Sequence, residues 1–341
     1  MKIPVSVIIP VYNAGDFIEK VVDAIFKQDY PGEIETIVVN DGSSDDTSLK
    51  ARTMITSVPK SRTLIVIDQP NKGAAEATNT GIRNATHDIV CSVDSDVLLY
   101  PDWLKKVVQE FSDPKVAAVQ GYYMTPKDAS FWAKMMGYDV ELRYDSIKSK
   151  YVSHVCTGNT AYRRDAIERV GLFDSSFVYG YDNDMSYRLQ KAGYKLVFLK
   201  DAQCDHYWKS TLYGYLKQQF RAGYGRLKLI KKHPDRKTGD SVSNIRMILQ
   251  VPLMFLILVL LLVTIPFYFL DYINGTVFLF PAFFLAFLLC ERFHFAVGAV
   301  KKHNDLSALA MPFVHLLRNL VWCFATVSWL WHNLSRKVGR G

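Results

Sequence analysis

Two aspartates separated by one serine, Asp94 and Asp96, directly follow a run of apolar residues. Alternate side chains of an extended segment point to the same side, so these two carboxylates are expected to lie close together. Adjacent carboxylates repel one another unless a proton or a cation lies between them. Hard divalent cations prefer oxygen ligands, and Mg²⁺ is often shared between carboxylates and a substrate's phosphates. The pair therefore indicates a metal site, and a simple turn at a strand end is the alternative, since short motifs also occur by chance.

Two further carboxylates stand at the start of a predicted helix, in the segment Gly180-Tyr181-Asp182-Asn183-Asp184. A carboxylate in such a place can take a proton from a substrate hydroxyl as a general base. Acidic residues in a first turn also compensate the helix dipole, which is the structural alternative. His206 ends the last extended stretch of this region, where it either joins the aspartates as a metal ligand or packs as a structural histidine.

The elements that must position these residues alternate along the chain. Apolar runs and helical patterns follow one another at residues 5–11, 17–28, 36–39, 49–58, 64–67, 74–85 and 89–93. Such alternation predicts a mainly parallel sheet covered by helices on both faces. Ligands of such sheets bind beyond the carboxyl ends of the strands. The polar residues expected at that edge are Tyr12, Asn13, Asp41, Lys72, Gly73, Asp94 and Asp96.

Missing motifs exclude several classes of protein. The first strand is followed by Gly15 alone and not by a GxGxxG loop, and no GxxxxGKS or GxxxxGKT loop occurs, which disfavours dehydrogenases and P-loop ATPases. The N-terminal apolar run suits a strand better than a signal peptide. The cysteines have no zinc spacing and look like small apolar residues of a reducing compartment. They are Cys91, Cys156, Cys204, Cys290 and Cys323.

The positive charge of the chain is concentrated before its apolar C-terminal part. The net charge is +8, and residues 217–246 contain nine Lys or Arg against two Asp. Their position next to an apolar run favours lipid headgroups over nucleic acid. Residues 213–230 are amphipathic at helical spacing, which predicts a helix at the membrane surface. A solvated basic helix packed on the N-terminal domain is the alternative.

The C-terminal part contains two clear membrane spans and a third, interrupted one. Residues 247–270 are 24 residues without a charge, about 36 Å as a helix and enough for a bilayer core of about 30 Å. Residues 272–290 predict a second span. Residues 311–334 are interrupted by Arg318, so this segment either spans with Arg318 near an interface or lies partly in the interface.

The basic residues around these spans give conflicting indications of the membrane topology. Lys301 and Lys302 follow the second span and fit a return to the cytoplasm. The tail of Arg336, Lys337 and Arg340 argues for a cytoplasmic end, which three full spans cannot give. The sequence therefore leaves two or three spans open.

Taken together, the motifs of the first 210 residues resemble those of the inverting glycosyltransferases of family 2. The matching stretches, in the family's order and spacing, are Val7 to Asn13, Val38 to Thr47, Asn71 to Gly73, Asp94 to Asp96, Thr157 to Asn159 and Gly180 to Leu189. The resemblance implies an α/β protein with the GT-A nucleotide-diphospho-sugar transferase fold. It also implies a nucleotide-diphospho-sugar donor and a divalent metal, Mg²⁺ or Mn²⁺.

The resemblance also implies roles for individual residues. The donor would be bound by Pro10, Tyr12, Asn13, Asp41, Lys72, Gly73 and Asp94. The metal would be held by Asp94, Asp96 and His206. The base would be Asp182, with Asp184 as the runner-up. The acceptor side would include Gly158, Asn159, Asp184, Arg188, Gln218 and Arg221.

Two positions depart from the patterns of related enzymes. Tyr181 replaces the Glu of the family's Glu-Asp pair, which puts acceptor contacts through that Glu in doubt. Ala222 stands where the Gln-x-x-Arg-Trp signature of membrane-bound polysaccharide synthases has its tryptophan. The second departure weakens the interpretation of the chain as a processive enzyme.

The sequence thus predicts a catalytic domain at residues 1–210, a basic juxtamembrane segment at 211–246 and a transmembrane region at 247–341. We expect a multi-pass enzyme of the cell membrane with its catalytic domain in the cytoplasm. It would move a sugar from a nucleotide sugar to a hydroxyl or phosphate acceptor that is lipid-linked, such as a polyprenyl phosphate or a lipid-borne glycan. Membrane lipids are expected partners, and nucleic acid is not. A processive polysaccharide synthase and a catalytically silent scaffold are the alternatives.

Overall fold

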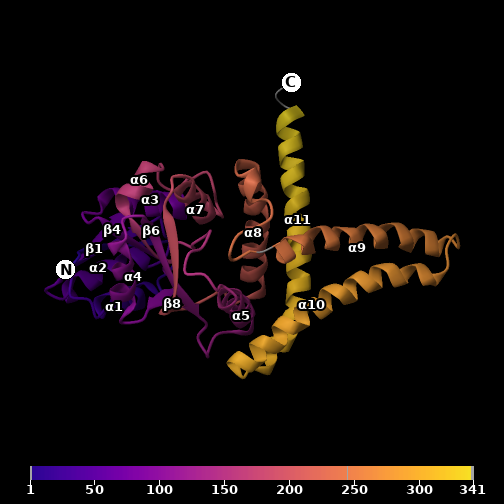
Figure 1. The fold of residues 1–341 in the computed structure, drawn as a ribbon, viewed down its shortest axis with the longest axis horizontal. Coiled ribbons are helices and arrows are strands. Elements are labelled where there is room, and N and C mark those ends of the chain that lie inside the picture. Colours follow the sequence, from indigo (N-terminus) through magenta and orange to yellow (C-terminus); the bar gives the residue numbers. More distant parts are fainter. Residues whose placement is uncertain (1, 244, 339–341) are drawn as a thin grey trace. The chain divides into compact units, whose positions relative to one another are not determined.

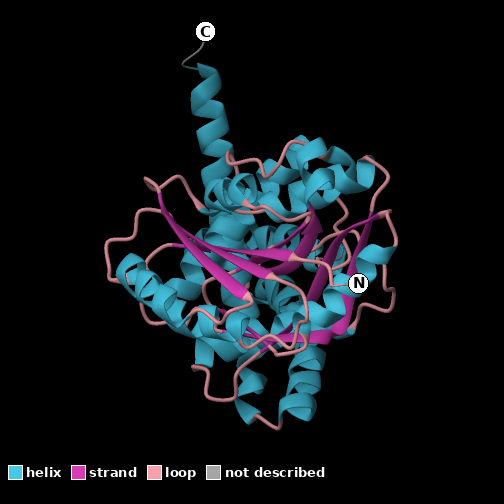
Figure 2. Ribbon diagram, turned by 90° about the vertical axis from the view of Figure 1, so that its left-hand side faces the viewer, coloured by secondary structure: helices cyan, strands magenta, loops and turns pink. Residues whose placement is uncertain are grey.

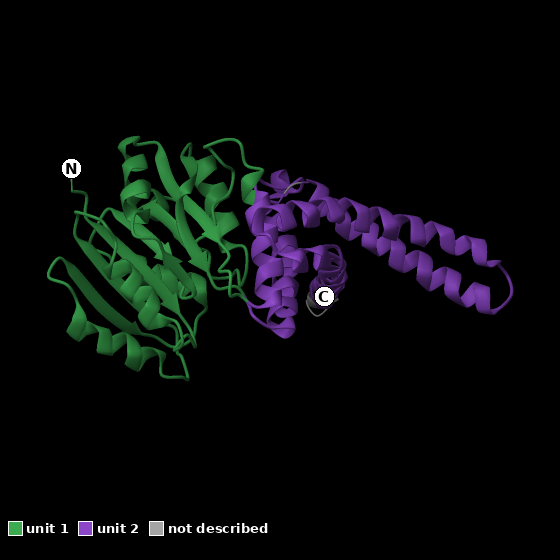
Figure 3. Ribbon diagram, turned by 90° about the horizontal axis from the view of Figure 1, so that it is seen from below, with its two compact units in different colours: residues 1–129, 144–208 green, residues 130–143, 209–341 purple. Residues whose placement is uncertain are grey.

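The protein folds into two compact units, green and purple in Figure 3. The computed structural model describes residues 2–243 and 245–338. Unit 1 comprises residues 1–129 and 144–208, and unit 2 comprises residues 130–143 and 209–341. Residues 130–143 lie inside the predicted catalytic range but fall in the unit that contains the C-terminal helices.

Unit 1 is built around one eight-stranded sheet, whose strands are magenta in Figure 2. The strands are β1 (Val5–Val11), β2 (Ile34–Asn40), β3 (Arg62–Asp68), β4 (Ile89–Val93), β5 (Val97–Leu99), β6 (Val116–Met124), β7 (Asn159–Arg163) and β8 (Lys195–His206). Their order across the sheet is β3-β2-β1-β4-β7-β6-β8-β5. The strand that leads into Asp94 therefore lies inside the sheet, between β1 and β7.

The first half of the sheet is parallel, as predicted. β1 pairs in parallel with β2 and β4, and β2 pairs in parallel with β3. Every residue of β1, β2 and β4 is buried, which is why these strands read as unbroken apolar runs and not as alternating ones. The register aligns Val11 with Asn40 and Asn40 with Asp68. The carboxyl ends of these strands thus meet at one edge.

The second half of the sheet is mixed. β7 is antiparallel to both β4 and β6, and β5 is antiparallel to β8. β6 pairs with β8 in parallel, with register shifts within the pair. β8 pairs through its two ends, residues 195–198 and 203–206, with a register shift between them, and it ends at His206. β5 was not predicted.

Helices flank the sheet of unit 1 (Figure 1). They are α1 (Ile18–Phe26), α2 (Thr47–Thr53), α3 (Ala74–Asn84), α4 (Trp103–Gln109), α6 (Arg164–Arg169) and α7 (Tyr181–Lys191), with 3-10 turns η1 (Met54–Ser57) and η2 (Glu110–Ser112). α1 buries one face at the spacing i, i+3, i+4 and i+7, namely Ile18, Val21, Val22 and Ile25. α3 packs on β1 through Gly81, where a Cβ would lie 2.3 Å from Cγ2 of Ile8.

Unit 2 is helical in the part of the chain that the structure describes. It contains most of α5 (Phe131–Asp145), then α8 (Leu212–Lys232), α9 (Ile245–Phe269), α10 (Leu279–His303) and α11 (Met311–Val338), with turns η3 (Pro234–Arg236), η4 (Gly275–Phe278) and η5 (Leu306–Ala310). Among the described residues, three helical segments are long and apolar enough to cross a membrane: Ile245–Phe269, Gly275–His303 and Leu306–Ser335. α9 and α10 lie side by side as an antiparallel pair (Figures 1 and 3). The sequence leaves two or three spans open, and three candidates agree with the larger number.

The charge that interrupts the third candidate span is buried and paired. Nη1 of Arg318 lies 3.5 Å from Oδ2 of Asp139 on α5. Nη2 of Arg318 donates to Oε1 of Gln250 on α9 at 2.8 Å. The side chain of Arg318 is only 3% exposed. Charged groups within membrane segments face the helix bundle and pair there, so this segment does not present a bare charge to lipid.

The predicted surface helix α8 packs against α11. A Cβ on Gly223 would lie 3.2 Å from Cβ of Ala325, and Nε1 of Trp322 donates to Oε1 of Gln219 at 3.2 Å. Small residues allow such a close approach of two helices. One side of α8 is therefore covered by α11 within the same unit.

The predicted basic tail lies outside the side chains that the structure describes. It comprises Arg336, Lys337 and Arg340. The side of the membrane on which the chain ends therefore stays a prediction.

Candidate active site

Asp94 and Asp96 lie on the turn between β4 and β5. The amide of Val97 donates to the carbonyl of Asp94 at 3.1 Å, and both carboxylates are partly exposed. Val97 pairs with His206 across the β5–β8 ladder. Oδ1 of Asp96 lies 3.3 Å from Nε2 of His206. The unpredicted strand β5 thus brings together two of the side chains that were predicted as metal ligands.

Two aromatic rings hold the imidazole of His206. The ring centroids of Tyr123 and Trp208 lie 4.7 and 3.6 Å from its own. His206 is buried, so its Nε2 is presented to Asp96 with little freedom. Carboxylate oxygens with one imidazole nitrogen form a donor set that suits Mn²⁺ or Mg²⁺.

Asp94 is held against the loop that precedes β7. Its amide donates to the carbonyl of Gly158 at 3.0 Å, and a Cβ on Gly158 would lie 2.3 Å from Oδ2 of Asp94. Glycine allows this close approach. Burial and the nearby charge of Asp94 raise the pKa of Tyr123 well above its ordinary value, so the hydroxyl of this neighbour stays protonated at neutral pH.

The loops at the carboxyl ends of β1, β2 and β3 are tied together by side chains that were predicted to bind the donor. Asp41 is buried and accepts hydrogen bonds from the amides of Lys72 and Gly73, both at 2.8 Å. Oδ1 of Asn13 accepts from a backbone amide of the loop after β2 at 2.8 Å. Asp41 and Asn13 therefore fix these loops, while the side chains of Tyr12 and Lys72 are exposed.

Backbone constraints explain two further predicted positions on this edge. Gly73 has a φ of +90°, which L side chains rarely adopt, and a Cβ there would have open space around it. Pro10 is buried in β1, where it is aligned with Val39 of β2. The part of these two residues in donor binding remains a prediction.

Helix α7 begins at Tyr181 and carries two aspartates in its first turn. Asp182 is partly exposed, and its Oδ1 accepts from the amide of Asn183 at 2.9 Å. Asp184 is fully buried, and its Oδ2 accepts from Nε of Arg188 at 2.8 Å. Arg188 also donates to two backbone carbonyls near the end of α6. Asp184 and Arg188 thus fix α7, and Asp182 is the more accessible carboxylate.

Tyr181, which stands where a glutamate was expected, lies near two of the key carboxylates. The hydroxyl of Thr157, in the loop before β7, donates to the hydroxyl oxygen of Tyr181 at 3.4 Å. Burial, together with the charges of Asp94 and Asp182, raises the pKa of Tyr181, so the phenol stays neutral at neutral pH. Asp94 packs on Gly158, which follows Thr157, and Tyr181 precedes Asp182, so this contact brings the segments of the two carboxylates together.

His154 is a neighbour of Asp182 that we did not predict from the sequence. Its Nε2 lies 3.6 Å from Oδ2 of Asp182 and 4.0 Å from Sγ of Cys156. His154 and Cys156 are two positions apart in the loop that precedes β7. That spacing was visible in the sequence, but the approach of Asp182 depends on how α7 packs.

The cysteines differ in their surroundings. Cys91, Cys204 and Cys323 are buried, as expected of small apolar residues, whereas Cys156 is partly exposed and Cys290 is exposed. Cys204 accepts a hydrogen bond from Nδ2 of the fully buried Asn159 at 3.1 Å. Asn159, predicted on the acceptor side, therefore has an internal partner.

The last two predicted acceptor-side residues belong to the other unit. Gln218 and Arg221 lie on α8, where Gln218 is half-buried and Arg221 is exposed. Unit 1 alone assembles the carboxylates, the histidines and the donor-side loops described above.

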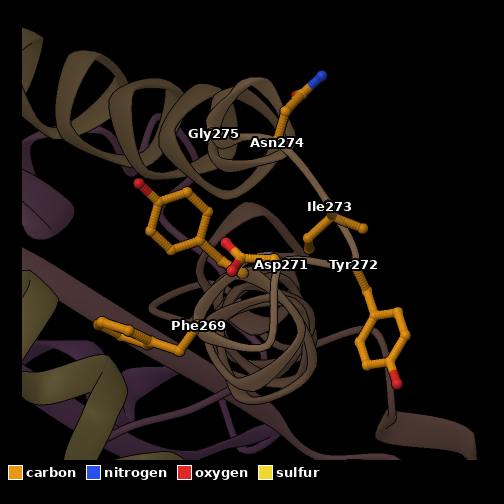
Figure 4. A pocket seen from close by; sticks show the side chains of 7 residues that line it. Phe269, Asp271, Tyr272, Ile273, Asn274 and Gly275 are labelled. Carbon is orange, nitrogen blue, oxygen red and sulfur yellow. The ribbon is translucent and has the colours of Figure 1, made fainter.

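A hollow at the turn between α9 and α10 contains none of these residues. It is lined by Tyr268, Phe269, Asp271, Tyr272, Ile273, Asn274 and Gly275 (Figure 4). This turn joins two candidate membrane spans, so the hollow is not part of the carboxylate site.

The fold and the site together define a class of protein. A mixed sheet flanked by helices, with a pair of aspartates at the carboxyl end of an inner strand, is the architecture of a GT-A glycosyltransferase. Residues 6–171 match the family described as "Glycosyl transferase family 2", and residues 89–291 match "Glycosyl transferase family group 2". The chain belongs to glycosyltransferase family 2.

Individual relatives agree with this assignment. The chain is 32% identical over 229 residues to glycosyltransferase AglE of Haloferax volcanii, which covers 66% of this chain and 73% of AglE. It is 28% identical over 228 residues to the poly-beta-1,6-N-acetyl-D-glucosamine synthase of Staphylococcus aureus, which covers 65% of this chain and 54% of that synthase. This chain thus spans about half the length of the second relative.

A solved structure shares the fold. The mannosyltransferase PcManGT from Pyrobaculum calidifontis, in complex with GDP-Man and Mn²⁺, superposes with a TM-score of 0.63 at 21% identity, covering 96% of this chain and 87% of that one. The predicted family, the GT-A fold and the class of enzyme are therefore confirmed.

Proposed function

We propose that this chain is a metal-dependent inverting glycosyltransferase that moves a sugar from a nucleotide-diphosphate donor to a lipid-linked acceptor at the cytoplasmic face of a cell membrane. The observation that carries the proposal is the approach of Asp96 to His206, at 3.3 Å. Asp94 lies on the same turn, and its neighbour Gly158 follows Thr157, which contacts Tyr181 beside Asp182.

The donor is placed along the carboxyl ends of β1 to β4, where α/β sheets bind their ligands. Asp41 and Asn13 hold the loops of this edge in place. Tyr12, 53% exposed, offers an aromatic face to a nucleobase, and the exposed Lys72 offers a positive charge to the phosphates. The presence of GDP-Man in the PcManGT complex supports a nucleotide sugar as donor.

Asp94, Asp96 and His206 would hold the divalent cation. The fit rests on their chemistry, since carboxylate oxygens and one imidazole nitrogen suit Mn²⁺ and Mg²⁺, and on the 3.3 Å separation of Asp96 and His206. Such a cation, when bound, stabilises the negative charge that develops on a leaving diphosphate. The neighbouring residues orient these ligands. Gly158 lacks a side chain and so leaves space for the Asp94 carboxylate, and two aromatic rings fix the imidazole of His206.

Asp182 acts as the general base in this proposal. Inversion requires that the acceptor oxygen attack the anomeric carbon from the face opposite the leaving diphosphate, and a hydroxyl acceptor gives its proton to a base as it attacks. Asp182 is the accessible aspartate of α7, whereas Asp184 is buried and bonded to Arg188. The amide of Asn183 holds one oxygen of Asp182 and thereby orients the other.

The membrane segments support a lipid-linked acceptor. Three helical segments of the described chain are long and apolar enough to span a bilayer, and the basic residues of 217–246 lie before and at the start of the first of them. Basic residues next to a span favour the cytoplasmic side, which is also where nucleotide sugars are made.

A processive polysaccharide synthase is the second candidate. The identity of 28% to the poly-beta-1,6-N-acetyl-D-glucosamine synthase favours it. Ala222, in place of the tryptophan of the synthase signature, counts against it. The length of the product separates the two candidates.

The test uses purified full-length protein with a panel of radiolabelled nucleotide sugars and two acceptors, a polyprenyl phosphate and a polyprenyl-linked glycan. We expect one donor to transfer a single sugar to the lipid, with activity lost in EDTA and restored by Mn²⁺ or Mg²⁺. Full transfer in EDTA would overturn the metal dependence. A ladder of lengthening products would establish the synthase instead.

A further inference from the structure

His154, Cys156 and Asp182 form a second cluster of metal-ligating side chains in unit 1. One ligand atom from each side chain, a ring nitrogen, the thiol sulfur and a carboxylate oxygen, lies within 4.8 Å of the other two. We propose that these three side chains form a zinc site whose occupation blocks Asp182 as a base. The inhibitory effect rests on the proposed function, whereas the site itself does not.

The separations within the cluster are close to those of a zinc site. With Zn–N and Zn–O bonds of about 2.0–2.2 Å and a Zn–S bond of about 2.3 Å, tetrahedral ligand atoms lie about 3.3–3.6 Å apart. Here Nε2 of His154 lies 3.6 Å from Oδ2 of Asp182 and 4.0 Å from Sγ of Cys156. The third separation, between Asp182 and Cys156, is at most 4.8 Å, so movements of up to about 1 Å would complete the coordination.

The surrounding structure holds these groups in place. The amide of Val155, between the histidine and the cysteine, donates to Oγ of Ser186 on α7 at 3.1 Å. This bond ties the loop before β7 to the helix that carries Asp182. One oxygen of Asp182 accepts from an amide of its own helix, which leaves Oδ2 as the oxygen that faces His154. The side chain of His154 is 7% exposed and that of Asp182 is 21% exposed, so an ion can arrive from solvent.

The ligand atoms of this cluster favour Zn²⁺ over Mg²⁺ and Mn²⁺, the cations that bind diphosphates. Thiolate and imidazole suit Zn²⁺, whereas carboxylates and water suit Mg²⁺ and Mn²⁺. The site around Asp94 and Asp96 contains no thiol among its proposed ligands, and the second site contains Cys156. Zinc can therefore occupy the second site while Mg²⁺ is in excess. Three protein ligands also leave a fourth position for water.

Zinc binding to Asp182 would stop the reaction at the proton transfer. A lone pair of the carboxylate is then bonded to the cation, and a nearby positive charge lowers the affinity of the group for a proton. The acceptor hydroxyl keeps its proton, and its oxygen does not attack the anomeric carbon. Removal of zinc by a chelator returns the base to its active form.

Cobalt substitution tests the site without any measurement of activity. Chelator-treated full-length protein in detergent with Mg²⁺ present is titrated with Co²⁺. We expect a thiolate-to-cobalt charge-transfer band that saturates at one ion per chain and disappears when Zn²⁺ is added. The band should be lost in Cys156→Ser, which still offers an acceptor to the hydroxyl of Tyr144, a partner of Sγ at 3.5 Å. It should persist in Cys290→Ser, a change at an exposed cysteine of unit 2.

The same experiment can overturn the proposal. A spectrum without the thiolate band, or a band that persists in Cys156→Ser, shows that there is no such site. His154→Gln provides a second variant, for which we expect zinc affinity to fall by more than about tenfold, since even outer-shell changes cost about 10–100-fold. An unchanged affinity in His154→Gln also overturns the site.

Zinc inhibition tests the consequence. With Mg²⁺ saturating, transfer by the wild type to a hydroxyl acceptor should fall with added Zn²⁺ and recover with a zinc chelator, and Cys156→Ser should need at least about tenfold more zinc. Equal zinc sensitivity of the two proteins overturns the inhibitory role. Protein that shows the cobalt band but transfers no sugar from any donor keeps the zinc site and overturns the proposed function instead.

Discussion

Gly158 and Asp94 pack so closely that a Cβ on the glycine would lie 2.3 Å from Oδ2 of the aspartate. The backbone of Gly158 is not left-handed, so the requirement for glycine comes from the space that the carboxylate occupies. Any side chain at this position would push Asp94 away from Asp96 or out of its place beside Tyr123.

Gly158→Ala should therefore impair donor use far more than folding. We expect kcat/KM for the nucleotide sugar to fall by about 100-fold, because a misplacement of about 1 Å near the reacting groups costs that much, with little change in Tm. Steady-state kinetics and thermal unfolding measure the two effects. Gly298→Ala is the control, since the nearest atom to its Cβ would be at an ordinary 3.6 Å. Equal kinetics of the two variants would contradict the prediction.

Asp96→Asn should raise the requirement for metal. The amide keeps the shape of the carboxylate but loses the charge that attracts a divalent cation. We expect the Mn²⁺ concentration for half-maximal transfer to rise by more than about tenfold, the lower end of the effect of an outer-shell change. Asp88→Asn, at the exposed start of β4, should leave the metal titration unchanged. If Asp96→Asn shows the wild-type titration, Asp96 is not a ligand.

Asp182→Asn should reveal the nature of the acceptor. For a hydroxyl acceptor, loss of the base should lower kcat by about 10²–10⁴-fold. A phosphate acceptor is already ionised at neutral pH and needs no base, so its transfer should fall by less than about tenfold. Parallel assays with a polyprenyl phosphate and a polyprenyl-linked glycan measure the difference. Undiminished transfer to the hydroxyl acceptor would remove Asp182 from the role of base.

Arg318→Met should destabilise unit 2 through Asp139. Burial alone would raise the pKa of Asp139, but its cationic neighbours, Arg143 and Arg318 among them, hold it well below its usual range. Breaking a buried ion pair costs about 3–5 kcal/mol, and we expect less, about 2–3 kcal/mol, because Arg143 stays 3.1 Å away. The double variant Arg318→Met, Asp139→Leu should recover most of the loss in Tm.

A change in an exposed ion pair provides the comparison for that experiment. Arg169 pairs with Asp165 in an exposed position, and Arg169→Met should change Tm little, because such pairs contribute about 0–1 kcal/mol. Equal effects of Arg318→Met and Arg169→Met would contradict the importance of the buried pair.

Asp68 should make the stability of unit 1 sensitive to acid. Hydrogen bonds from Asn40 and Ser48, with the ion pair to Arg52, lower the pKa of Asp68 from 3.8 to about 2. A lowered folded-state pKa stabilises the fold above the unfolded value and loses that contribution as the pH falls through the folded value. Asp68→Asn should therefore lower Tm at neutral pH, and the difference from wild type should vanish between about pH 4 and pH 2. A constant difference over this range would contradict the assignment.

The parallel half of the sheet could be predicted because its strands carry a local signal. β1, β2 and β4 are buried on both faces and so appear as unbroken apolar runs that end in polar residues. β5 has only three residues, Val97–Leu99, which is too short for any periodicity. Its existence depends on pairing with β8, more than 100 residues away in the chain.

The composition of the site could be predicted, but its pairings could not. Asp94, Asp96 and Asp182 stand out by residue type and by position after a strand or before a helix. The approach of His206 to Asp96 depends on the register of β5 against β8. The approach of His154 to Asp182 depends on the packing of α7. Neither is encoded by local spacing.

The placement of α5 in unit 2 determines where the chain can be cut to express unit 1 alone. α5 is inserted between β6 and β7 of unit 1, yet its buried Glu141 pairs with Lys302 at 2.8 Å, and Asp139 pairs with Arg318. A gene that stops after Trp208 would therefore express α5 with both carboxylates deprived of these partners. A soluble catalytic fragment needs two junctions, one after residue 208 and one that replaces residues 130–143 with a short polar linker.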